Sequence, residues 1–309
     1  MLNISRAGLY TSVQDTGRFG LRRSGVSQCG ALDIPALKIA NLLVGNDSGA
    51  AALEITLGQL VVSFTSNCWI ALTGADCHAD LDGKPLWTGW RFAVEPGQVL
   101  RLRAPRHGMR SYLGVSGGIQ VPEILGSSST DLKAGFGGLD GRLLADGDQL
   151  RLGKPIVLPK KQVGVKQLLF SNRIRALPGP EYQEFSEDAR NTFWRADWHL
   201  SPQSNRMGYR LQGPSLERHI SREMLSHGVL PGVVQIPHNG RPIVLMADAQ
   251  TTGGYPRIAC VIEADLYNLA QIRLGEPVHF IHCSLEDARR TLQEQQRYLE
   301  QLAWRLHGN

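Results

Sequence analysis

The chain has 309 residues, which exceeds a single small module and predicts two domains or one large β domain. Hydrophobic residues make up 42% and charged residues 20%, so a packed core is expected and extended disorder is not. The formal net charge is +5, and no run of Lys or Arg exceeds two residues. This mild excess argues against a nucleic-acid-binding protein.

The sequence also argues against a membrane or secreted protein. No apolar run approaches the roughly 18 residues that a membrane span requires. Residues 1–15 lack the basic and apolar regions of a secretory leader. The five cysteines are odd in number and form no C-x-x-C pair, which predicts reduced thiols in a cytoplasmic protein.

Turn signals between short apolar runs predict a mainly β protein. Glycine is about 11% of the chain (34 of 309), against roughly 7% in average usage. Two strands around a turn are predicted over 53–72 (Ser66-Asn67) and over 91–105 (Pro96-Gly97), and a strand that ends in a glycine turn over 110–122. Hairpins are predicted over 81–90 (Asp82-Gly83) and over 139–153 (Asp140-Gly141 and Asp146-Gly147). Such spacing is typical of a sandwich or barrel and not of alternating β and α units.

Two helices are predicted from their capping residues. Asp33 can cap a helix over 34–45, with Pro35 in its first turn and Gly45 at its end. Ser186 can cap a second helix over 187–197.

A third helix is predicted over 285–306, because Ser284 and Asp287 resemble a capping box. Its apolar stripe consists of Leu285, Ala288, Leu292, Leu299, Leu302 and Leu306. The stripe predicts that the helix packs on its own domain, with docking to a partner as the alternative.

The segment 154–167 contains prolines and lysines, and its apolar residues show neither helix nor strand periodicity. It is interpreted as the boundary between two halves of the chain. The second half is again strand-rich, and a strand is expected over the apolar run 257–272.

The common catalytic and metal-binding motifs are absent or weak. The sequence contains no P-loop and no H-E-x-x-H pair, and no metal site is expected. Gly114–Gly118 matches G-x-S-x-G, but the residues that follow are a poor helix start, so a glycine turn is favoured over a nucleophile elbow.

Three polar stretches remain as candidate binding segments. In the first, residues 11–25, Asp15 and Arg18 precede Arg22 and Arg23 ahead of the first helix. An ordinary N-terminal loop with solvated arginines is the alternative interpretation.

The second stretch, residues 201–213, places Asn205, Arg206 and Arg210 beside Gly208. Amides together with guanidinium groups suit a carboxylate or carbonyl ligand. A polar hairpin whose amides satisfy local backbone groups is the alternative.

The third stretch, residues 236–259, runs from an Asn239-Gly240 turn through an apolar strand into a dense group of donors and acceptors. That group consists of Asp248, Gln250, Thr251, Thr252, Gly253, Gly254 and Tyr255. Because binding loops are often built just after a buried strand, a functional role is favoured over a structural one.

Several of these segments closely resemble the biotin-dependent carboxyltransferase family. They are VQDTGRFG, GALDIPALKIANLLVGND, ALEITLGQL, ALTGADC, SNRMGYRL and PHNGRPIVLMADAQTTGGYPRIA. The resemblance runs from about residue 3 to residue 305, in order. The family includes the C-type subunit of the bacterial ATP-dependent 5-oxoprolinase, to which the likeness is greatest. It also includes an antagonist of a sporulation-kinase inhibitor and the carboxyltransferase domain of urea carboxylase.

The resemblance implies two cyclophilin-like β-barrel subdomains with a few flanking helices and a cleft between them. The N-terminal subdomain would span 1–155, with its leading loop and helix, and the C-terminal subdomain 166–309, with the last helix. It also implies direct pairing with a B-type subunit of 5-oxoprolinase. Together with an A-type subunit, the pair would act on 5-oxo-L-proline as a cytoplasmic hetero-oligomeric hydrolase.

ATP would then bind at the complex, and biotin is not expected on this chain, which has no Met-Lys pair. Two alternatives stay open. One is a regulatory protein that antagonises a kinase inhibitor, and the other is a carboxyltransferase that uses a separate biotin carrier.

From the residue chemistry, Arg206 is predicted to bind the substrate carboxylate or a phosphate, and Tyr255 to form a wall of the site. The full predicted substrate-binding set is Asn205, Arg206, Arg210, Asn239, Gln250, Thr251, Thr252, Gly253, Gly254 and Tyr255. Asp15 and Arg18 are secondary candidates, and no catalytic residue is assigned.

Overall fold

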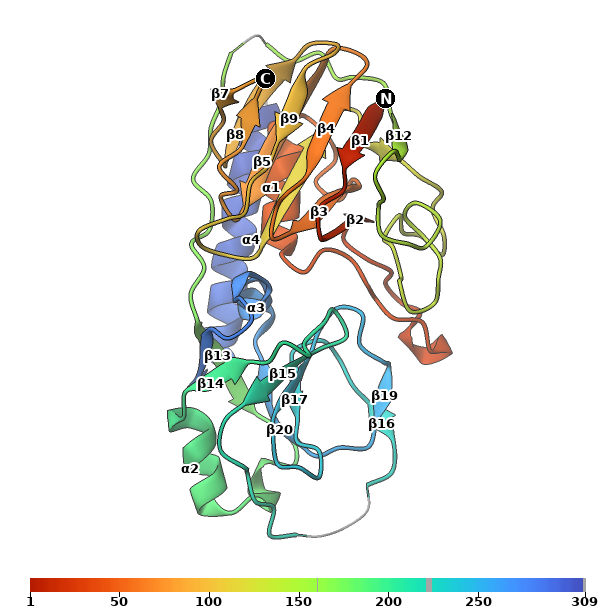
Figure 1. Ribbon diagram of the computed structural model, residues 1–309. Helices are drawn as coiled ribbons and strands as arrows, with labels where there is room; N and C mark the ends of the chain where they lie inside the picture. Colours follow the sequence, from red (N-terminus) through yellow and green to blue (C-terminus); the bar gives the residue numbers. More distant parts are fainter. Residues whose placement is uncertain (160, 221–223, 308–309) are drawn as a thin grey trace. The chain divides into compact units, whose positions relative to one another are not determined.

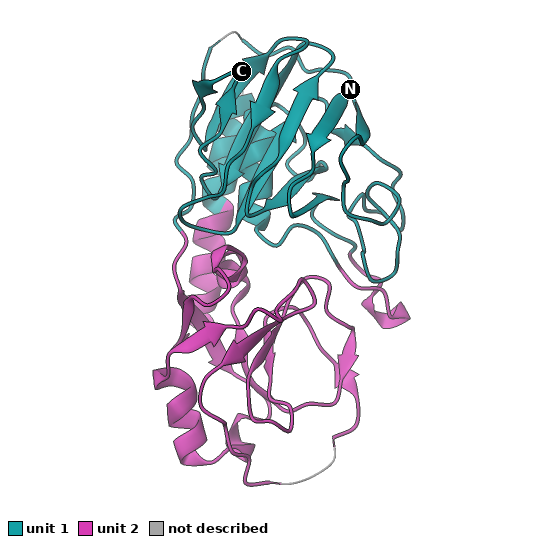
Figure 2. Ribbon diagram, in the orientation of Figure 1, with its two compact units in different colours: residues 1–18, 29–169, 297–309 teal, residues 19–28, 170–296 magenta. Residues whose placement is uncertain are grey.

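The computed structural model describes residues 1–159, 161–220 and 224–307, so Lys160 in the predicted boundary segment lies outside the described residues. The chain is 31% strand and 19% helix, which confirms the mainly β prediction. It forms two compact units (Figure 2). The first comprises residues 1–18, 29–169 and 297–309, and the second comprises residues 19–28 and 170–296.

Two antiparallel sheets build the first unit (Figure 1). One has the order β11 (Ile119–Gln120), β12 (Gln149–Leu152), β1 (Leu2–Arg6), β4 (Val61–Phe64), β9 (Val99–Arg101), β6 (Asp80–Leu81), β7 (Lys84–Pro85). The other has the order β2 (Tyr10–Gln14), β3 (Ala52–Thr56), β10 (Arg110–Val115), β5 (Cys68–Gly74), β8 (Trp90–Val94). Buried side chains of both sheets, such as Phe64 and Leu113, form one core cluster between them.

Turn chemistry explains one predicted hairpin and not another. Asp82 and Gly83 both have positive φ (49° and 82°), as the type I′ turn between β6 and β7 requires. The predicted hairpin at 139–153 is wrong, since β12 is the only strand in that fully described segment. Gly141 N instead donates to Gly137 O at 2.8 Å inside a loop, and β12 pairs with β1 and β11.

Helix α1 (Ile34–Leu43) confirms the first predicted helix. Asp33 caps it by accepting from Ala36 N at 2.9 Å. The helix packs on the five-stranded sheet, where Ala40 meets β10 closely. A Cβ on Gly114 of β10 would lie 2.9 Å from Ala40 O, so this close approach requires glycine.

A closed seven-stranded barrel forms the second unit. Its order is β13 (Arg173–Pro178), β20 (Arg257–Val261), β17 (Val233–Gln235), β18 (Ile243–Leu245), β15 (Gly208–Gln212), β14 (Trp198–Leu200), β21 (Pro277–His282). β13 and β21 are parallel, and the other pairs are antiparallel. A separate ribbon pairs β16 (His227–Gly228) with β19 (Thr252–Gly253).

The second unit also holds short helices. Helix α2 (Glu187–Arg195) is capped by Ser186, as predicted, and Phe193 stacks on Phe280 of β21 at 4.6 Å between ring centroids. Three 3₁₀ turns are η1 (Arg22–Ser24), η2 (Tyr182–Glu184) and η3 (Glu263–Asp265).

The strand predicted over 257–272 is wrong beyond Val261. There the chain turns through η3 into helix α3 (Leu266–Gln271). Asp265 explains the turn, because its carboxylate accepts from Arg175 N at 2.8 Å and from Arg175 Nη2 at 2.7 Å.

Helix α4 (Leu285–His307) confirms the third predicted helix, with Ser284 Oγ accepting from Asp287 N at 3.0 Å. Its first half packs Ala288 and Leu292 on the second unit. Its second half packs Leu299 and Leu302, with further apolar residues, on α1 in the first unit. The predicted stripe is wrong at Leu285, which is 54% exposed.

The five thiols, all free, are expected to react slowly while the chain is folded. Burial raises the pKa of Cys68 to about 11, and it also raises the pKa of Cys260 and Cys283. At pH 8 a thiol of pKa about 11 is only about 0.1% thiolate, the reactive form. We therefore expect five thiols to titrate with a disulfide reagent in denaturant and at most a minority to react promptly without it. Prompt reaction of all five in the native chain would contradict this burial.

Candidate functional site

A buried ion pair joins the second and third polar stretches within the second unit. Arg206 Nε and Nη2 donate to the two carboxylate oxygens of Asp248, each at 2.9 Å, and the side chains are 3% and 6% exposed. Backbone bonds from Asp248 N to Arg206 O and from Met246 N to Met207 O fix the same junction. Arg206 therefore links the 204–208 turn to the segment that follows β18.

Residues 19–28, which overlap the end of the first stretch, contact the same part of the chain. Arg22 Nη2 donates to Val229 O at 2.5 Å and to Gln250 O at 3.3 Å. Ser27 Oγ lies 3.4 Å from Asp248 O and 3.1 Å from Ala249 O. The segment 248–252, called the 248–252 loop below, is thus held by residues from both other stretches.

Two polar side chains of the 248–252 loop remain available to a ligand. Gln250 and Thr251 are half-buried, and neither side chain makes a hydrogen bond within the described chain. The loop backbone is nevertheless fixed, because Val229 N donates to Thr251 O at 3.0 Å. Fixed backbone with unsatisfied side-chain donors is an arrangement suited to binding.

Other predicted residues of the second and third stretches form local turns. Asn205 Oδ1 accepts from Met207 N at 2.9 Å, and Asn239 Oδ1 accepts from Arg241 N at 3.1 Å. These contacts match the alternative in which amides satisfy nearby backbone. Arg210 is exposed on β15, where its backbone N donates to Ser204 Oγ.

The end of the third stretch borders a cavity of the second unit. Thr252 and Gly253 form β19, and Gly254 and Tyr255 follow as part of the cavity wall. Tyr255 is 41% exposed and meets His238 edge-on, with ring centroids 6.0 Å apart. Tyr255 therefore lies at the wall of a cavity within the second unit.

The cavity has a volume of about 790 Å³ and a mixed lining. Its apolar side includes Phe185 and Ile236, and its charged side includes Arg218, paired with Glu184. Such a volume and lining fit a small ligand with one apolar and one polar side. Of the predicted set, only Gly254 and Tyr255 line it.

The secondary candidates Asp15 and Arg18 are buried in the first unit, where they brace the 124–130 loop. Asp15 Oδ1 accepts from Ser127 Oγ at 2.6 Å, and Asp15 Oδ2 accepts from Ser128 N at 2.6 Å. Arg18 donates to Ile124 O at 3.0 Å and to Ser129 O at 2.5 Å, and its guanidinium lies over Phe136. Both side chains therefore have extensive structural contacts.

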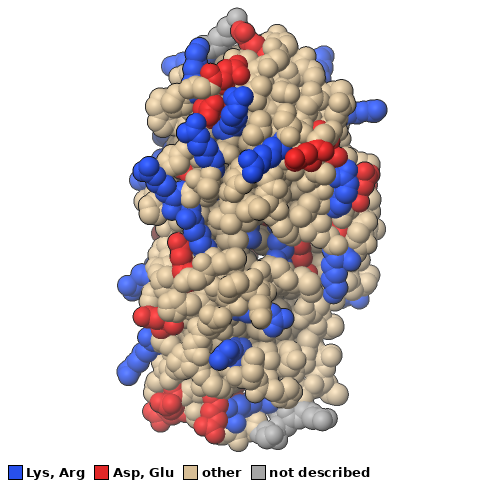
Figure 3. Space-filling view, viewed as in Figure 1, with Lys and Arg blue, Asp and Glu red and all other residues tan. Residues whose placement is uncertain are grey.

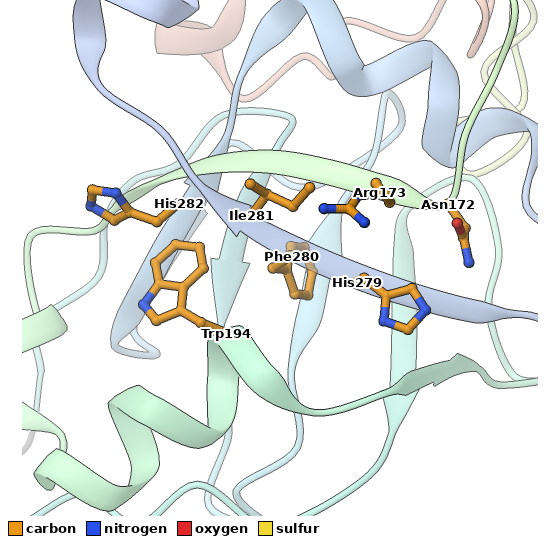
Figure 4. Close-up of a pocket in the computed structure, with 7 residues that line it drawn as sticks. All are labelled: Asn172, Arg173, Trp194, His279, Phe280, Ile281 and His282. Carbon is orange, nitrogen blue, oxygen red and sulfur yellow. The ribbon is translucent and has the colours of Figure 1, made fainter.

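A second depression of about 510 Å³ lies along β13 and β21 of the second unit (Figure 4). Trp194 lies near the His282 end of β21, at 5.3 Å between ring centroids, and His279 lies towards the other end. His279 Nδ1 is 3.0 Å from Asp197 Oδ1. None of the predicted residues lines this depression.

The charges on the described surface do not indicate a further binding site. Basic and acidic side chains are interspersed on the face shown in Figure 3. Within the described ranges, no three His, Cys, Asp or Glu residues gather closely enough to hold a metal ion. No helix among the residues that the structure describes is long and apolar enough to cross a membrane.

Arg22, Ser27 and His238 are among the residues at these sites that were not in the predicted set. Arg22 and Ser27 contact the 248–252 loop from more than 220 positions away in the chain, a pairing that no local pattern reveals. His238 is next to the predicted Asn239, and its place in the turn sequence PHNG was the available signal.

Known proteins match this chain along its whole length. The C-type subunit of 5-oxoprolinase from Escherichia coli (strain K12) is 67% identical over 308 residues, covering 100% of this chain and 99% of that protein. The protein of the same name from Haemophilus influenzae is 44% identical, covering 98% and 97%.

The crystal structure of the K. lactis urea amidolyase superimposes with a TM-score of 0.91 at 29% identity. That match covers 97% of this chain but only 20% of the amidolyase chain, so this protein spans a fifth of that larger one. The model of the carboxyltransferase domain, subdomain A and B, matches residues 24–282. The chain therefore belongs to the carboxyltransferase domain family, subdomain A and B.

Proposed function

We propose that this chain acts as the C-type subunit of an ATP-dependent 5-oxoprolinase, a complex that converts 5-oxo-L-proline to L-glutamate with hydrolysis of ATP. The observation that carries the proposal is the 67% identity to the E. coli protein of that name, over all of this chain and 99% of that protein. The likeness extends along nearly the whole of both sequences.

The proposal includes two partners. The B-type subunit would bind this chain directly, and the A-type subunit would join the same cytoplasmic complex. The sequence has no P-loop, so ATP is proposed to bind at the complex and not at a phosphate loop of this chain. We therefore expect the isolated chain to be inactive.

A lactam is a poor electrophile, and ATP supplies the activation by phosphorylating its amide oxygen before water attacks the carbon. Charge stabilisation and positioning are then the main requirements on the protein. This chain would contribute the braced 248–252 loop, whose Gln250 amide and Thr251 hydroxyl can position 5-oxo-L-proline. The half-buried position of both side chains limits competing water.

The urea amidolyase likeness supports a second candidate, carboxyl transfer with a biotin carrier on another chain. This chain spans a fifth of that protein and has no Met-Lys pair, so it would need the carrier and the carboxylase from elsewhere. Inhibition by avidin separates the two candidates, because only the second needs biotin.

Reconstitution with each of the three proteins left out in turn tests the proposal. We expect ATP hydrolysis stimulated by 5-oxo-L-proline only when this chain and both partners are present, without inhibition by avidin. Full stimulation in the absence of this chain would favour a regulatory role. Turnover by this chain alone would show that it holds a complete active site.

A further inference from the structure

The guanidinium of Arg22 is held by backbone carbonyls and has hydrogen-bonding capacity left over. Its Nη2 donates to Val229 O and Gln250 O. Its Nη1 is removed from solvent and has no hydrogen-bond partner among the described residues. A buried N–H of a charged group without an acceptor is costly, and native proteins rarely retain one.

Arg22 differs in its charge balance from four other arginines that are buried or partly buried in the second unit. Arg175, Arg206, Arg218 and Arg257 each form an ion pair with a carboxylate. No carboxylate of the described residues pairs with Arg22, and burial lowers the pKa of its guanidinium. Arg22 is thus a partly buried cation whose counter-ion the described chain does not supply.

The loop that carries Gln250 and Thr251 contacts this cation through its backbone. Gln250 is in direct contact with Arg22 through its carbonyl, and the side chains of Gln250 and Thr251 make no hydrogen bond within the described chain. The carbonyl contacts of Arg22 and Ser27 fix the loop that carries both side chains. Donors fixed in advance bind an anion without a large ordering cost.

We propose that Arg22, with the Gln250 amide and the Thr251 hydroxyl, forms a carboxylate-binding subsite in the second unit. The identity of its ligand, the carboxylate of 5-oxo-L-proline, rests on the proposed function. Arg206 is unsuited to this role, because its Nε and Nη2 are already bonded to Asp248. The carboxylate supplies the counter-ion that Arg22 lacks.

Two ligands separate recognition of the carboxylate from recognition of the ring. Ligand-observed NMR titration of the purified full chain would use 5-oxo-L-proline and 2-pyrrolidinone, the same lactam without its carboxylate. We expect wild type to bind 5-oxo-L-proline at least about 10-fold more tightly than 2-pyrrolidinone. Arg22→Gln should weaken binding of 5-oxo-L-proline by about 10- to 150-fold, the range for a charge-assisted hydrogen bond, and leave binding of 2-pyrrolidinone unchanged.

Arg22→Lys should recover part of the affinity, because lysine keeps the charge but not the planar donor set. Arg23→Gln is the matched control, since Arg23 is exposed on the same 3₁₀ turn and makes no hydrogen bond or ion pair within the described chain. It removes the same charge and should bind both ligands as wild type does.

Three patterns of measured affinity would overturn the subsite. They are equal affinity of wild type for the two lactams, unchanged binding of 5-oxo-L-proline by Arg22→Gln, and equal weakening of both ligands by Arg22→Gln. The last would mean that Arg22 only shapes the loop. Absence of binding of 5-oxo-L-proline to the wild-type chain would also overturn it. Activity of the reconstituted complex is measured separately, so failure of the proposed function is distinguishable from failure of the subsite.

Discussion

Replacing Arg206 with alanine is expected to lower the free energy of unfolding by about 3–5 kcal/mol. The substitution strands the Asp248 carboxylate, which is only 6% exposed, without its bidentate partner. It also removes the side-chain link between the 204–208 turn and the 248–252 loop. Urea unfolding followed by circular dichroism measures the loss of stability. Activity should fall only because less of the chain is folded and because the geometry of the loop is disturbed.

Arg210→Ala is the matched control for Arg206→Ala. Arg210 is exposed on β15, four positions along the chain, and its replacement should change stability by no more than about 0.5 kcal/mol. The double variant Arg206→Met, Asp248→Leu should recover much of the loss, because no buried charge is left unpaired. If Arg206→Ala unfolds like wild type but loses binding of 5-oxo-L-proline, then Arg206 binds substrate and its contact with Asp248 is incidental.

The Asp15→Ala substitution is expected to cost at least about 3 kcal/mol of unfolding free energy. The carboxyl group accepts from Ser127 Oγ, Ser128 N and Ser129 Oγ of the buried 124–130 loop and from the neighbouring Gly17 N, at 2.5–2.7 Å. Each bond to a charged group contributes about 1.5–3 kcal/mol, and buried donors left unpaired add their desolvation cost. Asp15→Asn should lose less, since the amide keeps one acceptor oxygen.

Asp47→Ala controls for the loss of an aspartate from a turn. Asp47 Oδ1 accepts from Gly49 N at 3.0 Å, in the same two-residue geometry as Asp15 with Gly17, but Asp47 is exposed. Its replacement should have a small effect. A stable Asp15→Ala chain that fails to support turnover would instead assign Asp15 to the working site.

Local chemistry explains which parts of the fold the sequence predicts well. Helices α1, α2 and α4 begin at Asp33, Ser186 and Ser284, whose capping side chains need only neighbours in the chain. Helix α3 was missed because its apolar run continues directly from β20, and six residues are too few to show a period. The turn there depends on Asp265 binding Arg175, 90 positions away.

The candidate site likewise has features that the sequence predicts and features that depend on distant contacts. The sequence singles out the stretch that contains the 248–252 loop, because a donor-rich loop after a buried strand has a recognisable pattern. It cannot show that Arg206 is neutralised by Asp248, 42 positions away, or that Arg22 lacks a carboxylate. The sequence shows an arginine in both cases. Only the three-dimensional contacts show whether its guanidinium is paired with a carboxylate.

Substitution of this chain into the E. coli enzyme tests the central proposal most directly. The measurement is L-glutamate formed from 5-oxo-L-proline and ATP by the proposed A-type and B-type partners, taken from E. coli, with this chain in place of its 67% identical C-type relative. We expect the chain to restore glutamate formation that is absent without it. Glutamate formation that does not depend on this chain would contradict the proposal. So would its absence with this chain while the E. coli C-type protein supports turnover under the same conditions.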